Sequence, residues 1–341
     1  MNFYRLLSLA SGHKLPPSLK VLGLATLHLL HRRTVAVYLD PVTGCNLRCR
    51  MCYFSSPKHD SRLRSIDDER LKQVADAFFH RAMKVQIGCG TEPSLYPKLL
   101  EIIRLARNAD VPFVSMTTNG QLLASNGNKL NALVEAGLNE ITISAHGTKK
   151  NTYEYLMPGA KFERFESLLA LLSSVKNKYP DFIIRLNFTF NSLNIEDLRP
   201  DNFSALWHEI KPDIVQLRPV QDIGGIWTDY NIQVLKERYG ETIGKLREYL
   251  GAIGVTVIAP DKEQLDSVND TQDWASSIIE DVSYCYVSPD SVYKPDFIVG
   301  KDTYESYHRR CRTLKRLLQC VLGRRKGRHR NATKKLNYTV K

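Results

Sequence analysis

The chain has 341 residues, 43% of them hydrophobic, which is enough for one large core of roughly 200–250 residues together with further segments. The net charge is +12, but 13 of the 48 lysines and arginines lie beyond residue 305, where there is no aspartate or glutamate. The rest is therefore nearly neutral, which argues against a nucleic-acid-binding surface spread over the whole protein.

The N-terminal segment, residues 1–33, is predicted to be helical. No secretory signal is recognised, because polar residues at Ser11–Lys14 interrupt the apolar run. Leu19–Leu30 reads as an apolar helix too short to span a bilayer, which needs about 20 residues. It is expected to cap one end of the core, with a position on a membrane surface as the alternative. Seven cysteines without a disulfide-like pattern favour a reducing, cytoplasmic location.

Three cysteines follow the first predicted strand, Val35–Asp40, and the loop Pro41–Gly44 that ends it. They are Cys45, Cys49 and Cys52, a C-x3-C-x2-C spacing that suits thiolates on one soft metal centre and is too tight for useful disulfides. With no fourth cysteine nearby, one iron of an iron–sulfur cluster would stay open for a substrate. A zinc site, for which His59 is a poorly placed fourth ligand, and a site without metal are the alternatives.

Short β-branched runs then alternate with longer amphipathic runs, which is typical of parallel βα units. A capping box at Ser65–Asp68 is expected to start the first helix of this series. The further expected strands are 84–88, 112–117, 140–144, 182–190 and 213–218, and the expected helices between them are 98–108, 127–136, 164–178 and 203–210.

The cysteine spacing and its surroundings resemble the radical S-adenosylmethionine (SAM) family. The resemblance implies an α/β fold, an open six-stranded parallel (β/α)6 partial TIM barrel over residues 34–223. It also implies a 4Fe-4S cluster on Cys45, Cys49 and Cys52, with SAM chelated at the open iron. Reductive cleavage of SAM would yield a 5′-deoxyadenosyl radical that abstracts a hydrogen atom from a substrate. A reductant protein of the flavodoxin or ferredoxin type would be a partner.

Gly88-Cys89-Gly90-Thr91-Glu92-Pro93 resembles the family's Gly-Gly-Glu-Pro element. Glycines there let the backbone approach the SAM methionine, and a glutamate adds an acceptor. Met51, just before the last cysteine, stands where the family has a residue packing near adenine. The cofactor-binding residues expected from this resemblance are therefore Met51, Gly88, Gly90, Thr91, Glu92 and Pro93.

Polar residues at other strand ends complete the expected site. The family places ribose-binding groups where Asn119 and Ser144 lie, although Asn119-Gly120 is equally a good turn sequence. Strand alternation sends Arg185 and Asn187 to the barrel interior, with Arg185 as a candidate for the SAM carboxylate. No catalytic residue is identified, and His146 and Arg218 are the candidates.

Three further segments follow the core. Residues 224–283 are expected to hold a long helix, 230–250, and an edge strand, 255–258. Residues 284–307, starting at Tyr284-Cys285, resemble a degenerate SPASM or twitch auxiliary-cluster module, a relic because too few cysteines remain. Residues 308–341 are expected to form a helix carrying Cys311 and Cys320, and a basic tail.

The substrate is expected to be a peptide or a small metabolite, because the core is neutral and the last module resembles SPASM. RNA modification by methyl or thio transfer is the alternative. Methyl transfer of the kind known in the family would need Cys311 or Cys320 near the active site. A non-enzymatic iron–sulfur scaffold is the third reading. The basic tail is a candidate for weak contact with RNA or an anionic membrane.

Overall fold

The protein is built around one open sheet of eight parallel strands. The computed structural model describes residues 15–56, 62–206, 210–220, 232–260, 274–294 and 296–322. The strands run in the order β7-β6-β5-β4-β3-β2-β1-β8, and each neighbouring pair is parallel. They are β1 (Val35–Leu39), β2 (Ala82–Ile87), β3 (Val114–Thr118), β4 (Glu140–Ala145), β5 (Ile183–Phe190), β6 (Ile214–Pro219), β7 (Thr256–Ile258) and β8 (Tyr284–Val287).

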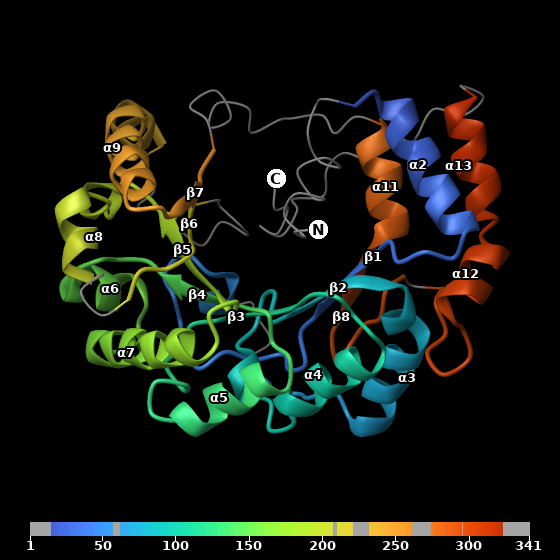
Figure 1. The fold of residues 1–341 in the computed structure, drawn as a ribbon, viewed down its shortest axis with the longest axis horizontal. Coiled ribbons are helices and arrows are strands. Elements are labelled where there is room, and N and C mark those ends of the chain that lie inside the picture. Colours follow the sequence, from blue (N-terminus) through green and yellow to red (C-terminus); the bar gives the residue numbers. More distant parts are fainter. Residues whose placement is uncertain are drawn as a thin grey trace.

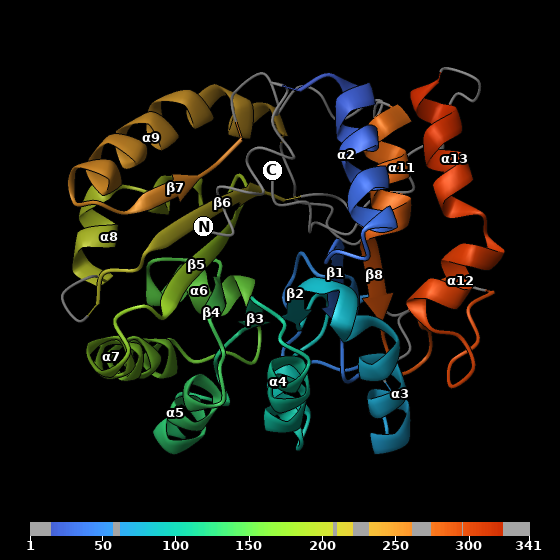
Figure 2. The ribbon, with the colours of Figure 1, turned by 45° about the vertical axis from the view of Figure 1, so that its right-hand side comes forward.

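Helices cover the outer face of this curved sheet (Figure 1). Along the arc from β7 to β1 they follow one another as α9, α8, α7, α5, α4 and α3, while α2, α11, α12 and α13 gather beyond β1 and β8 (Figure 2). The helices are α2 (Pro17–Leu29), α3 (Asp68–Phe78), α4 (Leu99–Asn108), α5 (Gly127–Glu135), α6 (Lys150–Leu156), α7 (Phe162–Lys178), α8 (Pro200–Leu206), α9 (Ile232–Ala252), α11 (Trp274–Ser283), α12 (Tyr304–Arg310) and α13 (Thr313–Val321).

The periodicity of the sequence explains these elements. In α4 the buried residues recur at helical spacing and form one apolar stripe toward the sheet. In β5 the side chains alternate, with Leu186, Phe188 and Phe190 fully buried while Asn187 and Thr189 line a cavity. Because all strands are parallel, their carboxyl ends and the loops that follow meet at one edge of the sheet.

The six expected core strands are confirmed, and β7 and β8 extend the same sheet in parallel at its two edges. β8 is the start of the segment that resembled a SPASM module. It pairs with β1, so that Val37 lies opposite Cys285. The resemblance to an auxiliary-cluster module is not confirmed, because Cys285 is fully buried within the main sheet.

The first helix of the βα series, α3, begins at Asp68, the last residue of the predicted capping box. Asp67, not Ser65, is the N-cap of α3, and its carboxylate accepts a hydrogen bond from the backbone N–H of Arg70. An aspartate directly before the helix satisfies one of the free N–H groups of the first turn, so the capping function moves two residues along.

The N-terminal helix does not fill the barrel. α2 packs on α11 and α13 in a small separate core of Val21, Leu24, Ala25, Leu317 and Cys320 among others. The single helix expected over Cys311 and Cys320 is two helices, because Arg312 has a left-handed backbone conformation (φ 50°) between α12 and α13. No helix within the described ranges has the length and apolar character to cross a membrane.

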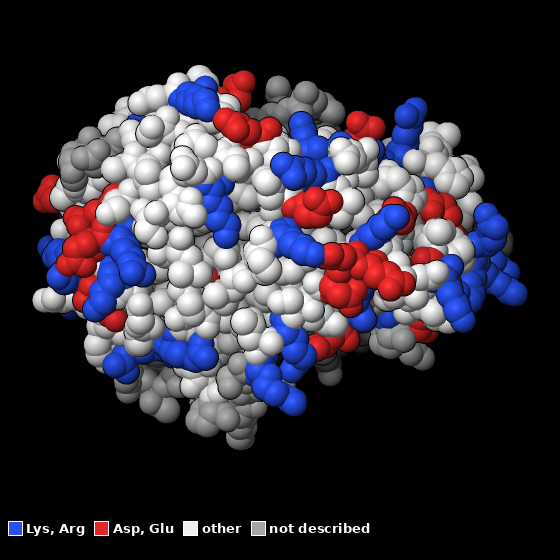
Figure 3. All heavy atoms as spheres, turned by 90° about the horizontal axis from the view of Figure 1, so that it is seen from below, with Lys and Arg blue, Asp and Glu red and all other residues white. Residues whose placement is uncertain are grey.

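Charge is distributed as the sequence indicated for the body of the protein. Acidic and basic side chains interleave over the face seen in Figure 3. Residues 323–341, the basic tail expected from the sequence, lie outside the described residues.

Candidate cofactor-binding site

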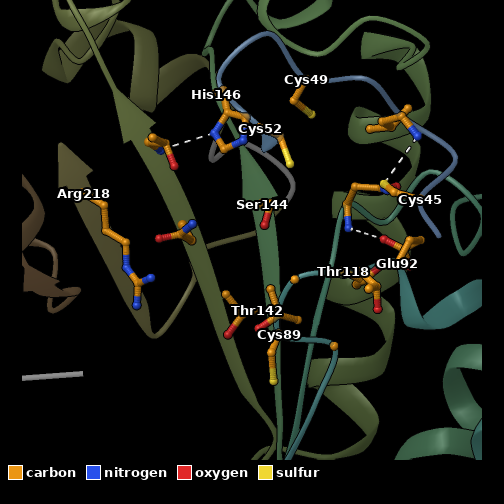
Figure 4. Close-up of a pocket in the computed structure, with 18 of the residues that line it drawn as sticks. Cys45, Cys49, Cys52, Cys89, Glu92, Thr118, Thr142, Ser144, His146 and Arg218 are labelled. Carbon is orange, nitrogen blue, oxygen red and sulfur yellow. Dashed lines mark hydrogen bonds between the residues drawn. The ribbon is translucent and has the colours of Figure 1, made fainter. Parts of the chain in front are cut away.

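One cavity of about 220 Å³ opens at the carboxyl ends of the strands and continues into the barrel interior. The cysteine loop (Cys45–Cys52) borders one end of it, and Thr142, Cys89 and Arg218 lie farther from the three loop cysteines (Figure 4). Every expected site residue except Pro93 lines this cavity: Cys45, Cys49, Met51, Cys52, Gly88, Gly90, Thr91, Glu92, Asn119, Ser144, His146, Arg185, Asn187 and Arg218.

The cysteine loop is held against the linker between α6 and α7. The backbone N–H of Arg48 donates to the carbonyl of Pro158, and that of Arg50 donates to the carbonyl of Leu156. The N–H of Cys52 donates to the carbonyl of Cys49, and this hydrogen bond closes a turn that holds the last two cysteines near each other. All three thiols are free of disulfides, and all three line the cavity.

The donor set of the cysteine loop fits a cluster better than a single metal ion. Within the described part of the chain, no three His, Cys, Asp or Glu side chains lie close enough to hold one ion. In a 4Fe-4S cluster each cysteine binds a different iron, so the three sulfur atoms need not converge on one point. Burial raises the pKa of Cys45 to about 11 and raises the pKa of Cys49 and Cys52 as well, so the thiols are protonated until iron displaces the protons.

The glycine loop (Gly88–Pro93) follows β2 and is shaped by close backbone approach. Gly88 has φ +74°, and a Cβ there would collide with the carbonyl oxygen of Thr117. At Gly90 a Cβ would lie 2.7 Å from the hydroxyl of Tyr53, the residue after the last cysteine. The glycine loop therefore packs closely on Thr117 and Tyr53. A side chain at Gly88 would be strained and would meet backbone, whereas one at Gly90 would have to displace the Tyr53 hydroxyl.

Asp40, at the end of β1, anchors the glycine loop. Its Oδ1 accepts hydrogen bonds from the N–H of Cys89 at 2.6 Å and the hydroxyl of Thr91 at 2.9 Å, and its Oδ2 accepts from the N–H of Gly90 at 3.1 Å. The hydroxyl of Tyr286 in β8 donates to Oδ2 at 2.8 Å. Burial raises the pKa of this carboxyl, and the hydrogen bonds act in the opposite direction.

Glu92 joins the glycine loop to the loop after β3. Its Oε1 accepts from the N–H and the hydroxyl of Ser94 and from the hydroxyl of Thr118, at 3.0, 2.5 and 2.6 Å. Its Oε2 accepts from the N–H of Asn119 at 2.8 Å. The sequence predicted a direct acceptor for SAM, but four protein donors already occupy this buried carboxylate, so it primarily positions the two loops.

Asn119, the first residue after β3, connects the loop that follows β3 to the cysteine loop. Its side-chain amide donates to Oδ1 of Asn46 at 2.9 Å and points at the sulfur of Cys45 at 3.8 Å. Its own Oδ1 accepts from the N–H of Gln121. The residue is thus a bridge in the loop framework and not only the turn residue that its sequence also allowed.

His146 is a buried hydrogen-bond acceptor. Its Nδ1 accepts from the backbone N–H of Thr189 at 3.2 Å, which ties the end of β4 to β5. Burial lowers its pKa to about 4, so the ring is neutral at physiological pH. A neutral ring with one nitrogen engaged keeps only Nε2 for a ligand in the cavity.

Arg185 lies deeper in the barrel than the SAM-carboxylate prediction required. Its guanidinium forms an ion pair with Glu140 at 3.2 Å and donates to Oε1 of Gln216 at 3.2 Å. The two charged side chains are 3% and 1% exposed.

Oδ1 of Asn187, which also lines the cavity, has no hydrogen-bond partner in the described structure, so it can accept a bond from a bound hydroxyl or amine.

Several site residues were not singled out from the sequence. Asp40 was assigned only to a strand and Tyr286 only to the SPASM-like module, and nothing local indicates that their side chains meet. Lys84 and Glu140 were read as strand residues, although charged residues inside β-branched runs are unusual enough to mark interior positions. Lys84 is buried and lines the cavity, and burial lowers its pKa to about 7.

The remaining cysteines are divided between the cavity and the periphery. Cys89 lines the cavity. Cys285 lies in β8, Cys311 ends α12, and Cys320 belongs to the core around α2, so none of these three lines the cavity. The requirement that Cys311 or Cys320 reach the active site for RNA methylation is therefore not met.

Comparison with known proteins identifies the family. Residues 39–198, from the end of β1 to the segment before α8, match the Radical SAM superfamily. The chain contains a radical SAM domain. The family uses a 4Fe-4S cluster and SAM, which agrees with the free cysteines and the glycine loop on one cavity.

Among the relatives of this radical SAM protein is a probable GTP 3′,8-cyclase of Saccharolobus solfataricus, 31% identical over 157 residues, which are 45% of this chain and 47% of that protein. A GTP 3′,8-cyclase of Chlorobaculum tepidum is 27% identical over 198 residues, 56% of each protein. The chain thus spans about half the length of the curated relatives that it matches.

Solved structures share the fold. Streptococcus suis SuiB bound to S-adenosylmethionine aligns with a TM-score of 0.56 at 14% identity, over 84% of this chain and 67% of that one. Native anSMEcpe with bound AdoMet aligns with a TM-score of 0.55 at 19% identity, over 78% and 75%. These likenesses confirm the open α/β barrel.

Proposed function

We propose that this radical SAM protein cleaves SAM reductively and uses the 5′-deoxyadenosyl radical to abstract a hydrogen atom from a substrate in the barrel. The observation that carries the proposal is the shared cavity, which joins three free cysteine thiols to a polar barrel interior. When bound, the cluster and SAM supply the electron transfer and the radical chemistry.

The chain's own residues bind, orient and exclude water. Cys45, Cys49 and Cys52 are the proposed cluster ligands. The methionine part of SAM would lie against the glycine loop, whose shape Asp40 and Glu92 maintain. Met51, Asn119, Ser144 and Asn187 are proposed to contact the nucleoside, and the free Oδ1 of Asn187 supports a contact with a hydroxyl.

Deeper residues are proposed to hold the substrate. Lys84, Arg218 and the Arg185–Glu140 pair line the part of the cavity below the strand ends. Lys84, Arg185 and Glu140 are buried and Arg218 is partly buried, and buried charges are costly unless they are paired with one another or with a ligand. His146 is neutral and lines the same cavity, and its Nε2 is proposed to orient a bound group.

We propose a small molecule or a peptide as the substrate. Relatives that match half of this chain are named GTP 3′,8-cyclases, which supports a small molecule. The RNA-modifying alternative has less support, since neither Cys311 nor Cys320 lines the cavity. A protein electron donor of the flavodoxin or ferredoxin type is the proposed partner, and the cytoplasm is the proposed location.

Anaerobic reconstitution with iron and sulfide, followed by SAM and dithionite, tests the first step. We expect 5′-deoxyadenosine to form, and to be lost in Cys49→Ala. A loaded wild-type protein that produced none would refute the proposal. Mass spectrometry of cell extracts with and without the gene would then identify the substrate.

A further inference from the structure

The outer face of α2 is a row of exposed leucines. The helix buries Val21, Leu24 and Ala25 against α11 and α13. Away from this side, the leucine row has side chains between 42% and 60% exposed: Leu19, Leu22, Leu27 and Leu29 within the helix, and Leu15 and Leu30 just beyond its two ends. At 100° per residue the four leucines within the helix fall within about half of its circumference, so they form one broad apolar face.

This leucine row is unusual for a surface helix. Lys20 is the only Lys, Arg, Asp or Glu between Pro17 and Leu29, and Thr26 and Gly23 are the other exposed residues on the leucine side. Single exposed leucines are ordinary, but a contiguous apolar surface marks a binding face. α2 is therefore apolar on both sides, although only one side is covered by the protein.

The neighbouring helix α13 adds to this surface. It packs on α2 through the shared core and exposes Leu318 and Leu322 at 43% and 64%. Exposed basic residues accompany both helices. Arg32 after α2 and Lys315 in α13 are exposed, and eight lysines and arginines follow Leu322 in the sequence without any acidic residue.

We propose that the face formed by α2 and α13 is a peripheral binding site for an anionic lipid bilayer. The leucine row would enter the boundary between headgroups and acyl chains, and the flanking cations would contact the headgroups. Stable attachment to a membrane usually needs two signals, and in the sequence a polybasic segment directly follows α13, the helix that packs on α2. The helix is too short to cross the bilayer, so it lies on the surface.

The combination of features selects a lipid surface over RNA. Cations alone would suit RNA phosphates equally well. RNA-binding surfaces, however, place aromatic side chains beside their cations to stack on bases, whereas this face presents leucine. Exposed leucines have no comparable contact to make with a nucleic acid.

Sedimentation of the reconstituted full-length protein with lipid vesicles tests the proposal. We expect it to bind vesicles of phosphatidylcholine mixed with phosphatidylglycerol, to bind phosphatidylcholine alone weakly, and to be released by high salt. The double variant Leu19→Glu/Leu22→Glu should bind the anionic vesicles at least about tenfold more weakly, because two leucines no longer leave water. The matched control is Leu193→Glu, an equally exposed leucine (46%) far along the chain from α2, which should bind like the wild type.

A gain-of-binding variant guards against misfolding. Gly23 lies on the exposed side of α2 with nothing within 4 Å of an added Cβ, so Gly23→Leu should tighten vesicle binding by roughly tenfold. Wild-type protein that ignores anionic vesicles would overturn the proposal. Binding that is unchanged in both the Leu19→Glu/Leu22→Glu and Gly23→Leu proteins would do the same, as would tighter binding to polyuridylate RNA that these variants leave unaltered.

Discussion

The hydroxyl of Tyr286 donates a hydrogen bond of 2.8 Å to Oδ2 of Asp40, and this contact ties the last strand of the sheet to the glycine loop. The two residues are 246 positions apart in the chain. Asp40 in turn accepts from the backbone of Cys89 and Gly90. Residues beyond the family-matched range of 39–198 therefore help to shape the proposed SAM site.

Replacing Tyr286 with phenylalanine should weaken SAM binding while the cluster is retained. The change removes one hydrogen-bond donor from the buried carboxylate of Asp40. An unpaired buried acceptor destabilises the folded site by about 1–3 kcal/mol, and the loss raises the pKa of Asp40 further. Isothermal titration of SAM into the loaded protein measures the effect. Tyr284→Phe is the control, since Tyr284 stacks on Tyr38 and its ring is kept. Equal SAM affinity in both variants would show that β8 does not support the site.

The cluster assignment predicts about four irons per chain, bound through the cysteine loop alone. Alanine at Cys45, Cys49 or Cys52 should abolish the absorbance near 400 nm that dithionite bleaches. Cys285→Ala should leave it unchanged, because Cys285 is buried in β8. Iron analysis and absorbance spectra decide the point, and eight irons in the wild type would contradict it.

The sequence was sufficient for the parts of the fold that depend on local pattern. Alternation in β5 and helical spacing in α4 predicted both elements to within two residues, and the cysteine spacing predicted one edge of the cavity. It could not predict contacts between distant segments. Pairing of β8 with β1 depends on which strand edge is free, and the Arg185–Glu140 pair depends on register. Both are properties of the assembled sheet.

Glu92→Gln should loosen the junction between the glycine loop and Asn119. Oε2 of Glu92 now accepts a hydrogen bond from the backbone N–H of Asn119. Glutamine keeps one acceptor oxygen but would place its NH2 group opposite that N–H, and two donors cannot pair. We expect weaker SAM binding and slower 5′-deoxyadenosine formation, with the iron content unchanged. Glu101→Gln, in the first turn of α4, is the control. A fully active Glu92→Gln protein would remove Glu92 from the positioning framework.

The Arg185–Glu140 pair separates two roles for Arg185. If the guanidinium serves mainly to neutralise Glu140, Arg185→Met should lower the free energy of unfolding by about 3–5 kcal/mol, because a buried carboxylate loses its partner. The double variant Arg185→Met/Glu140→Leu should then recover most of this loss and bind SAM normally. If Arg185 binds the SAM carboxylate, the double variant should be stable and still fail to bind SAM. Urea unfolding and SAM titration of the three proteins distinguish the two outcomes.

Lys84 should make the stability of the protein rise with pH above neutrality. Burial, with a smaller contribution from the charge of Arg185, lowers its pKa from 10.5 to about 7. Between these two values the unfolded chain binds a proton that the folded protein does not, so the free energy of unfolding increases as pH rises through this window.

Lys84→Met keeps a long side chain without the charge and should remove that increase. The measurement is the difference in unfolding free energy between wild type and Lys84→Met at pH 6.5 and at pH 9.5. We expect Lys84→Met to be the more stable protein at the lower pH and its advantage to shrink at the higher one. A difference that stays constant would mean that Lys84 remains charged in the folded barrel at both pH values, and that burial does not lower its pKa.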